Sequence, residues 1–183
     1  PTAAGRDAPT WPLVEAIAFL AGEMRFAGLG RQSPWLDEIT NWQLTVERGP
    51  QFGGSVHWLT HLFQWLGLQV SDSEWGLRLS AAVFGTLAVA VFTSWLLRRA
   101  GQAVAIAGGV ILAFSPFQIF YSQDANHYAM VLLAASLTLL IGDTYFLRRG
   151  GARSLFPILV VAYVLAGGIH PTTFSVPLTL LIL

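Results

Sequence analysis

Long apolar runs separated by short polar segments dominate the second half of the chain. Gly76–Leu97, Gln102–Tyr121 and His127–Leu147 are almost uninterrupted apolar sequence. A hydrocarbon core about 30 Å thick requires about 20 residues of helix, and each run comes close to that length. The pattern therefore predicts three membrane-spanning helices in this part of the chain.

The same pattern extends toward both ends of the chain. Trp11–Leu29 predicts an earlier span, although it contains charged residues, and Ser154–Ile169 predicts a slightly shorter later one. Phe174–Leu183 is apolar to the last residue but has only about half the length of a crossing. We expect an all-α integral membrane protein with about five transmembrane helices and the start of a sixth. Residues 1–183 would form a single transmembrane helical domain, the N-terminal part of a longer protein.

The segment Gly30–Trp75 is too long for a simple connection and has patterned sequence of its own. A helix start is predicted after Ser33, which can cap it, because Asp37 and Glu38 would then lie in the first turn, where the helix dipole favours acids. In Val56–Gly67 apolar residues recur at helical spacing, which is typical of an amphipathic helix at a membrane interface. We expect residues 30–75 to form a long extracytoplasmic first loop containing interfacial helices.

Composition agrees with a membrane protein, since 54% of residues are hydrophobic, 11% are charged and the mean hydropathy is +0.58. The formal net charge of zero argues against a nucleic-acid partner and leaves membrane lipid as the expected one. The chain has no cysteine, which excludes disulfides and thiolate metal sites.

The basic residues predict an orientation in the membrane. All ten are arginines, and five of them lie between predicted spans, at Arg98 and Arg99 and again in 148–153. By the positive-inside rule these loops are cytoplasmic, and so is the N-terminus. We expect a multi-pass protein of the bacterial inner membrane. Three polar segments then meet on the extracytoplasmic face: Gly30–Trp75, Ser115–Asn126 and His170–Thr173.

Four histidines offer candidate ligands. His57 and His61 stand four residues apart and would share a helix face, as metal-binding pairs do. No third ligand of the usual kind lies nearby, so solvated interfacial histidines are the preferred interpretation. His127 or His170 at the end of a span could instead ligate a tetrapyrrole, a less favoured alternative.

Three motifs resemble those of a known class of enzymes. They are Arg25–Glu38, which contains a Trp-x-Asp-Glu sequence, Asp72–Ser80, and Ser115–Ala129, which is similar to Ser-Pro-x-x-x-x-Tyr-Ser-Gln-Glu-Ala-Arg-x-Tyr-Ala. Together they resemble the N-terminal half of the GT-C class of membrane glycosyltransferases, especially the dolichyl-phosphate-mannose protein mannosyltransferase family and its bacterial relatives. The order of the three motifs and the spacing between them are similar to those of the family across nearly the whole chain.

The resemblance implies an enzyme that transfers a sugar from a polyprenyl-phosphate donor to an extracytoplasmic hydroxyl acceptor with inversion. Asp37 matches the catalytic acid of the first loop, which would remove the acceptor's proton. Glu38 would orient Asp37, hold the acceptor or stabilise the helix start. Asp124 would bind sugar hydroxyls or, together with Asp37, a divalent cation such as Mg²⁺ or Mn²⁺. Candidate substrate-binding residues are Gln123, Tyr121, Tyr128 and His170.

Two departures from the family pattern support an alternative. Asn126 stands where the pattern usually has arginine, and Gly49–His57 lacks a common Pro-Pro-Leu motif. The chain could therefore be an inactive accessory or scaffold subunit that meets other membrane subunits through small residues such as Gly85 and Gly108. A transporter is disfavoured, because the charged residues of the first span lie toward its ends and no internal repeat is visible.

Overall fold

The computed structural model describes residues 11–49, 57–147 and 169–170. These residues form seven helices and the segments that join them. In chain order the helices are α1 (Trp11–Phe26), α2 (Leu36–Arg48), α3 (Trp58–Val70), α4 (Glu74–Ala100), α5 (Gln102–Phe114), α6 (Pro116–Ser122) and α7 (Tyr128–Leu147). The expectation of an all-α chain agrees with this part of the structure.

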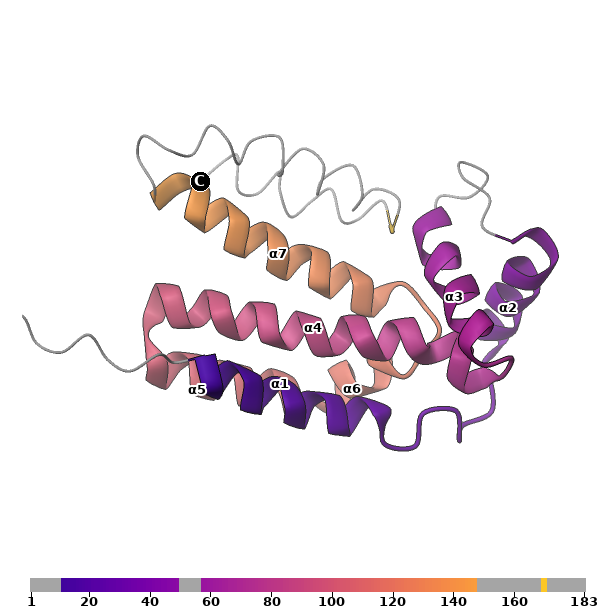
Figure 1. Ribbon diagram of the computed structural model, residues 1–183, viewed down its shortest axis with the longest axis horizontal. Helices are drawn as coiled ribbons and strands as arrows, with labels where there is room; N and C mark the ends of the chain where they lie inside the picture. The colour runs from indigo at the N-terminus through magenta and orange to yellow at the C-terminus, as the bar shows by residue number, and fades with distance from the viewer. Residues whose placement is uncertain (1–10, 50–56, 148–168, 171–183) are drawn as a thin grey trace, which may run out of the picture.

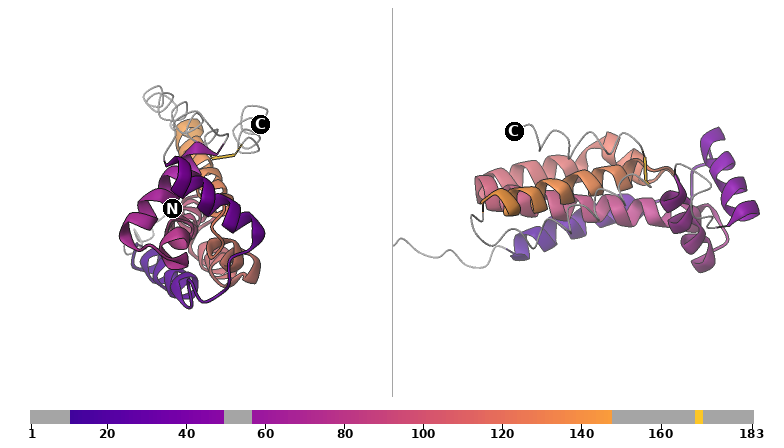
Figure 2. Two further views of the ribbon diagram at one scale, coloured as in Figure 1. Left: turned by 90° about the vertical axis from the view of Figure 1, so that its right-hand side faces the viewer. Right: turned by 90° about the horizontal axis from the view of Figure 1, so that it is seen from above.

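The longest helix, α4, is the centre of the arrangement (Figure 1). It packs against α1, α3, α5, α6 and α7. The helices α1, α5 and α7 run along its length, whereas α2 and α3 gather at its N-terminal end (Figures 1 and 2). We call the helices α2 and α3 the cap.

Local sequence explains the bounds of α4. The Ser73 hydroxyl accepts a hydrogen bond from the Gly76 amide at 3.4 Å and so caps the first turn. Arg98 and Arg99 occupy the last turn, where the helix dipole favours cations. The helix ends at Gly101, whose φ of +86° is readily adopted only by glycine.

Small and branched apolar side chains pack the helices together. Ile17 and Ala21 of α1, Val89 of α4 and Ala113 of α5 form one buried cluster. A second cluster joins Leu68 of α3, Leu77 of α4 and Ala125 of the loop before α7. The second cluster therefore ties the cap to the residues that precede α7.

The expectation of five transmembrane helices is wrong for the described residues. Only α4 is by itself long and apolar enough there to cross a membrane, and the bent pair α5 and α6 could make a second crossing if counted as one span. α1 has 16 residues and so falls short of the predicted Trp11–Leu29 span. The predicted run 154–168 and Phe174–Leu183 lie outside the described residues.

The third predicted span, Gln102–Tyr121, is broken into two helices bent by 57°. Pro116 explains the break, because it has no backbone N–H to donate and its ring clashes with the preceding turn. Ser115 begins α6 by accepting a long hydrogen bond from the Gln118 amide. The uniform hydropathy of the segment concealed this bend.

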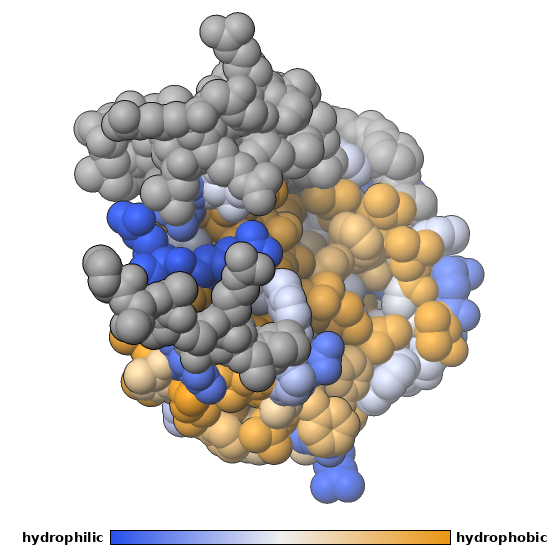
Figure 3. All heavy atoms as spheres, turned by 60° about the vertical axis from the view of Figure 1, so that its left-hand side comes forward, coloured by the Kyte–Doolittle hydropathy of each residue, from blue (hydrophilic) through white to orange (hydrophobic). Residues whose placement is uncertain are grey.

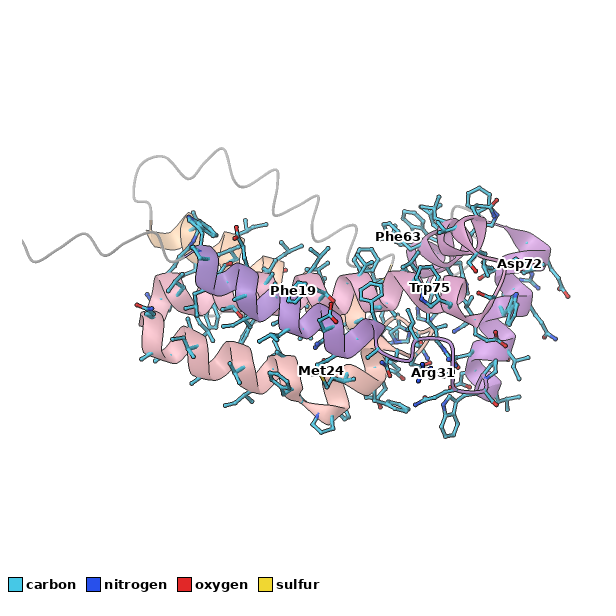
Figure 4. The ribbon with its side chains drawn as sticks, turned by 60° about the horizontal axis from the view of Figure 1, so that its bottom comes forward. Phe19, Met24, Arg31, Phe63, Asp72 and Trp75 are labelled. Carbon is cyan, nitrogen blue, oxygen red and sulfur yellow. The ribbon has the colours of Figure 1, made fainter. Side chains whose placement is uncertain are left out.

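The outer surface is rich in large apolar side chains, and hydrophobic residues spread over much of the face in Figure 3 that is free of grey atoms. Phe19 of α1 is 67% exposed and Ile111 of α5 is 72% exposed. Phe19 and Met24 project outward from α1 (Figure 4). Buried positions, in contrast, include polar and charged side chains such as Arg25 and Arg78. Such exposed apolar and buried charged side chains reverse what is usual in water, although the interior also holds the two apolar clusters described above.

The cap shows the same reversal. The prediction of a helix within Val56–Gly67 is correct in type, but Thr60, His61 and Gln64 of α3 are buried, while Leu66 is 44% exposed. α3 therefore turns these three polar side chains toward the rest of the molecule. The expectation that its histidines are solvated is wrong for His61, which is 8% exposed.

Candidate functional site

The acid pair of the first loop begins α2. Trp35 occupies the N-cap position, and its backbone N–H donates to Glu38 Oε2 at 3.0 Å. This is the carboxylate half of a capping box, so the predicted cap by Ser33 is wrong. Asp37 and Glu38 lie in the first turn of the helix, as expected.

Glu38 is buried and its two carboxylate oxygens are fully engaged. Arg78 of α4 donates from Nε to Oε1 at 2.7 Å and from NH2 to Oε2 at 2.6 Å, and the Ala125 amide donates to Oε1 at 2.7 Å. Burial alone would raise the pKa of Glu38, but the hydrogen bonds from Arg78, Ala125 and Trp35 together lower it. The carboxylate of Glu38 thus joins α2, α4 and the loop before α7.

Asp124 lies in that loop next to the ion pair. Burial, followed by the charge of Glu38, raises the pKa of Asp124 to about 6, although Arg78 opposes the effect. The charge of Asp37 adds to the increase. The structure therefore brings together the three acids that the sequence singled out, at the end of α4 that carries the cap.

Asp37 differs from its two acidic neighbours because its side chain is exposed. It follows Leu36 in the first turn of α2, directly before the buried Glu38. A carboxylate in this setting is open to a substrate hydroxyl.

The remaining residues of the loop are anchored from several sides. The Ala125 carbonyl accepts from Asn41 Nδ2 of α2 at 3.1 Å and from Gln64 Nε2 of α3 at 2.8 Å. Gln123 Nε2 lies 2.9 Å from the Ala27 carbonyl and 3.1 Å from the Arg25 carbonyl. The predicted substrate-binding residue Gln123 thus has its amide nitrogen turned toward the end of α1.

The predicted aromatic residues line a groove at the two ends of the loop that carries Asp124. Tyr121 and Tyr128 meet edge to face, with ring centroids 4.5 Å apart. Both border a groove of about 290 Å³ between α6 and α7, and its other lining residues are Phe117, Gln118, Val131, Leu132 and Ala135. Tyr128 also contacts His127 at 4.6 Å between centroids.

Three histidines from distant segments stack next to this groove. The centroid of His127 lies 4.3 Å from that of His170 and 4.9 Å from that of His57, with interplanar angles of 12° and 4°. His57 Nδ1 lies 2.8 Å from the Ile169 carbonyl oxygen. Burial, together with the neighbouring His170 and His57 rings, lowers the pKa of His127 to about 4. The predicted site residue His170 therefore lies near the end of the loop that carries Asp124.

The expected divalent-cation site has two candidate ligands among the described residues. Both oxygens of Glu38 are occupied by protein donors, which leaves Asp37 and Asp124 as the available carboxylates. Within 11–49, 57–147 and 169–170, no group of three His, Cys, Asp or Glu side chains could hold a metal ion. In the predicted histidine pair His57 and His61, the Nδ1 atom of His61 lies 3.3 Å from Thr45 Oγ1 of α2, within hydrogen-bond distance. We therefore derive no chemical step through a bound cation.

The sequence analysis missed the residues that hold the acids in place. Arg78 was assigned to no site, although a charged residue at the start of an otherwise apolar helix needs a partner, and that signal could have found it. Asn41 and Gln64 gave no comparable signal, because amide side chains are common on surface helices.

Comparison with protein families, with curated proteins and with solved structures gave no match to this chain.

Proposed function

We propose that this chain carries the acid site of a membrane glycosyltransferase of the GT-C class. It transfers a sugar from a polyprenyl-phosphate donor to a hydroxyl acceptor and inverts the anomeric carbon. The observation that carries the proposal is that three neighbouring acids lie in different environments. Asp37 is exposed, Glu38 is locked by Arg78, and Asp124 has a pKa raised to about 6. Carboxyl groups with divergent environments are typical of acid and base pairs.

Asp37 acts as the general base in this proposal. Its carboxylate takes the proton of the acceptor hydroxyl as the oxygen attacks the anomeric carbon of the sugar. The bond from that carbon to the phosphate oxygen breaks on the opposite face, and its electron pair leaves with the polyprenyl phosphate. One displacement of this kind forms one glycosidic bond and inverts the configuration.

Glu38 supports the base without accepting the proton. Its oxygens are engaged by Arg78 and by backbone amides, and it fixes the first turn of α2 on which Asp37 stands. Of the roles considered for Glu38, orientation of Asp37 and stabilisation of the helix start are the two that this geometry supports.

Asp124 and the aromatic groove hold the sugar in this proposal. A carboxyl group with a pKa of about 6 can donate as well as accept a hydrogen bond near neutral pH, which suits sugar hydroxyls or a phosphate oxygen. Tyr121 and Tyr128, at the two ends of the loop that carries Asp124, offer their rings to the sugar. His170, which is linked to Tyr128 through the ring of His127, completes the proposed substrate-binding set.

We place the protein in a membrane, with the acid site at the extracytoplasmic side. One described helix, α4, is long and apolar enough to cross. Its last turn carries Arg98 and Arg99, and Arg98 lies 6.0 Å from the ring of Trp11 at the start of α1. Under the positive-inside rule this end is cytoplasmic and the N-terminal end of α1 with it. The inner membrane of a bacterium is the proposed location.

The direct test of the proposed base is Asp37→Asn in the full-length protein. Membrane vesicles would be supplied with a panel of polyprenyl-phosphate sugars carrying radiolabelled mannose, glucose or galactose, and label in acceptor would be counted. We expect Asp37→Asn to lower the rate by about 100-fold or more, since general bases contribute about 10²–10⁴. Asp72→Asn, at an exposed loop position, is the matched control and should transfer normally. Transfer by Asp37→Asn at the wild-type rate would overturn the assignment.

The alternative of an accessory subunit has one supporting observation, the apolar outer faces of α1 and α5. The small residues first considered for contact with other subunits are used inside the molecule. A Cβ on Gly109 would lie 2.6 Å from Thr93 Oγ1, and Gly108 is in contact with Leu96. Lipid is a sufficient partner for the outer faces, so we keep the enzyme as the proposal.

A further inference from the structure

Arg25 of α1 is a buried cation that donates hydrogen bonds to main-chain carbonyls. Its side chain is fully buried, and NH1 donates to the Ala21 carbonyl at 3.0 Å and to the Ala113 carbonyl at 3.1 Å, while NH2 donates to the Leu112 carbonyl at 3.3 Å. Ala113 and Leu112 belong to the last turn of α5, whose carbonyls have no partner within the helix. The negative end of the α5 dipole favours the guanidinium charge. Arg25 thus caps the helix that ends at the Pro116 bend.

Gln123 makes the reverse connection. It follows α6, and its Nε2 lies 2.9 Å from the Ala27 carbonyl, 3.1 Å from the Arg25 carbonyl and 3.3 Å from the Met24 carbonyl. These carbonyls belong to the C-terminal turn of α1 and the residue after it. A side chain of α1 therefore caps α5, and the side chain that follows α6 caps α1. We call this pair of interactions the clasp.

The clasp lies where three helices meet closely. A Cβ on Gly85 of α4 would collide with Ser122 Oγ of α6 and would lie 3.1 Å from Arg25 Nε. Glycine at this position lets α1, α4 and α6 approach one another. The position of Gln123, one residue after Ser122, is thereby fixed against α1.

The neighbour on the other side of Asp124 is also fixed. The Ala125 amide donates to Glu38, and its carbonyl accepts from Asn41 and Gln64. Asp124 is held between Gln123, anchored on α1, and Ala125, anchored on the cap. Loss of either anchor would free its carboxyl group from the neighbourhood of Glu38.

We propose that Arg25 and Gln123 are positioning residues that clasp the broken helix α5–α6 against α1 and so hold Asp124 beside Glu38 for substrate binding. The inference rests on the function proposed above, but the geometry that carries it does not depend on which sugar is transferred. It gives Gln123 a positioning role in place of direct contact with substrate.

A purely structural role and a positioning role predict different results. If the clasp only stabilises the fold, its loss lowers the unfolding temperature and leaves the proton affinity of Asp124 unchanged. If it positions Asp124, its loss lets water reach the carboxyl group, and the pKa of Asp124 falls from about 6 toward the ordinary value of about 3.9.

The test is Gln123→Met in the full-length protein, which keeps the length of the side chain and removes its donors. The pKa of Asp124 would be measured by carbon NMR of protein labelled at the aspartate carboxyl carbon, with the Asp124→Asn spectrum as the assignment. The control is Gln69→Met, because Gln69 Nε2 also donates to a helix carbonyl, that of Trp65, but on the exposed side of α3. Arg25→Lys, which keeps the charge with a different donor geometry, is the second variant.

We expect Gln123→Met to lower the pKa of Asp124 by at least one unit, Arg25→Lys to lower it by less, and Gln69→Met to leave it unchanged. An unchanged pKa in folded Gln123→Met would overturn the proposal. If Gln123→Met does not fold, Gln123→Asn, shorter by one methylene, is measured against the same two outcomes. A lowered pKa of Asp124 in Gln123→Met would support the clasp even if the wild-type protein transferred none of the sugars. The absence of transfer by wild type would count against the proposed function alone, so the two failures are distinguishable.

Discussion

Glu38 and Asp124 are neighbouring carboxyl groups to which the structure gives opposite proton affinities. Glu38 is paired with Arg78 in a bidentate contact and accepts backbone hydrogen bonds, which outweighs the cost of its burial. Asp124 has the burial and the nearby negative charge without an equal number of donors. At the residue scale, the site therefore consists of one fixed anion, one group that titrates near pH 6 and the exposed Asp37.

The Glu38–Arg78 pair should be essential for stability. Arg78→Met leaves a buried carboxylate without its cation, and breaking a buried pair costs about 3–5 kcal/mol. We expect this loss in the free energy of unfolding measured with denaturant in detergent micelles. The control is Arg99→Met, since the Arg99–Asp143 pair is 3.9 Å long and its arginine is 56% exposed. Exposed pairs contribute about 0–1 kcal/mol. Equal effects of the two substitutions would contradict the account of Glu38.

The lowered pKa of His127 predicts an acid-sensitive fold. Between the unfolded value of about 6.5 and the folded value of about 4, the unfolded chain binds more protons, so stability falls as pH decreases through this window. Asp124, whose pKa is raised, contributes with the opposite sign. Because Asp124 is present in both wild type and His127→Gln, its contribution cancels when the two pH profiles are compared. Denaturant unfolding should show a smaller loss on acidification in His127→Gln, and parallel pH profiles of the two proteins would contradict the prediction.

At the scale of the elements, α2 has one buried face and two exposed flanks of different polarity. Glu38 and Thr45 point inward, whereas Ile39 and Val46 form an exposed apolar flank, 42% and 60% exposed. Thr40 and Glu47, each the next residue along, form an exposed polar flank. A helix with an apolar and a polar flank side by side is typical of the membrane interface.

The two flanks of α2 should differ in their contact with lipid. The chain has no cysteine, so single cysteines can be introduced at these four positions and spin-labelled. In lipid vesicles, labels at 39 and 46 should collide preferentially with oxygen, which partitions into lipid. Labels at 40 and 47 should collide preferentially with a water-soluble nickel complex. The same preference at all four positions would show that α2 does not lie at the interface.

The helices themselves were largely predictable from hydropathy, but their lengths and bends were not. Apolar runs correctly indicated α4 and α7, yet the same signal concealed the break at Pro116 and overestimated α1. The acids Asp37 and Asp124 were identified from their motifs. The inward face of the cap was not predicted, because Asn41 and Gln64 acquire their role only when α2 and α3 fold over the loop at Ala125. Such tertiary contacts leave no local periodicity in the sequence.

At the scale of the whole molecule, the candidate acid site lies at the end of the bundle that carries the cap (Figure 1). Glu38 and Arg78 are buried there, while the sides of α1 and α5 present large apolar residues. In the proposed function, a lipid-linked donor would reach the acids without its chain leaving the membrane, and a water-soluble acceptor would approach the exposed Asp37 from outside.

The most direct test of sugar transfer by this site is the anomeric configuration of the product. Full-length protein in vesicles would be given a polyprenyl-phosphate sugar of known configuration and a hydroxyl acceptor, and the new glycosidic bond would be examined by proton NMR. A single displacement assisted by Asp37 predicts the inverted anomer in wild type and its formation about 100-fold or more slowly in Asp37→Asn. Retention of configuration, or the inverted product formed equally by Asp37→Asn, would contradict the account.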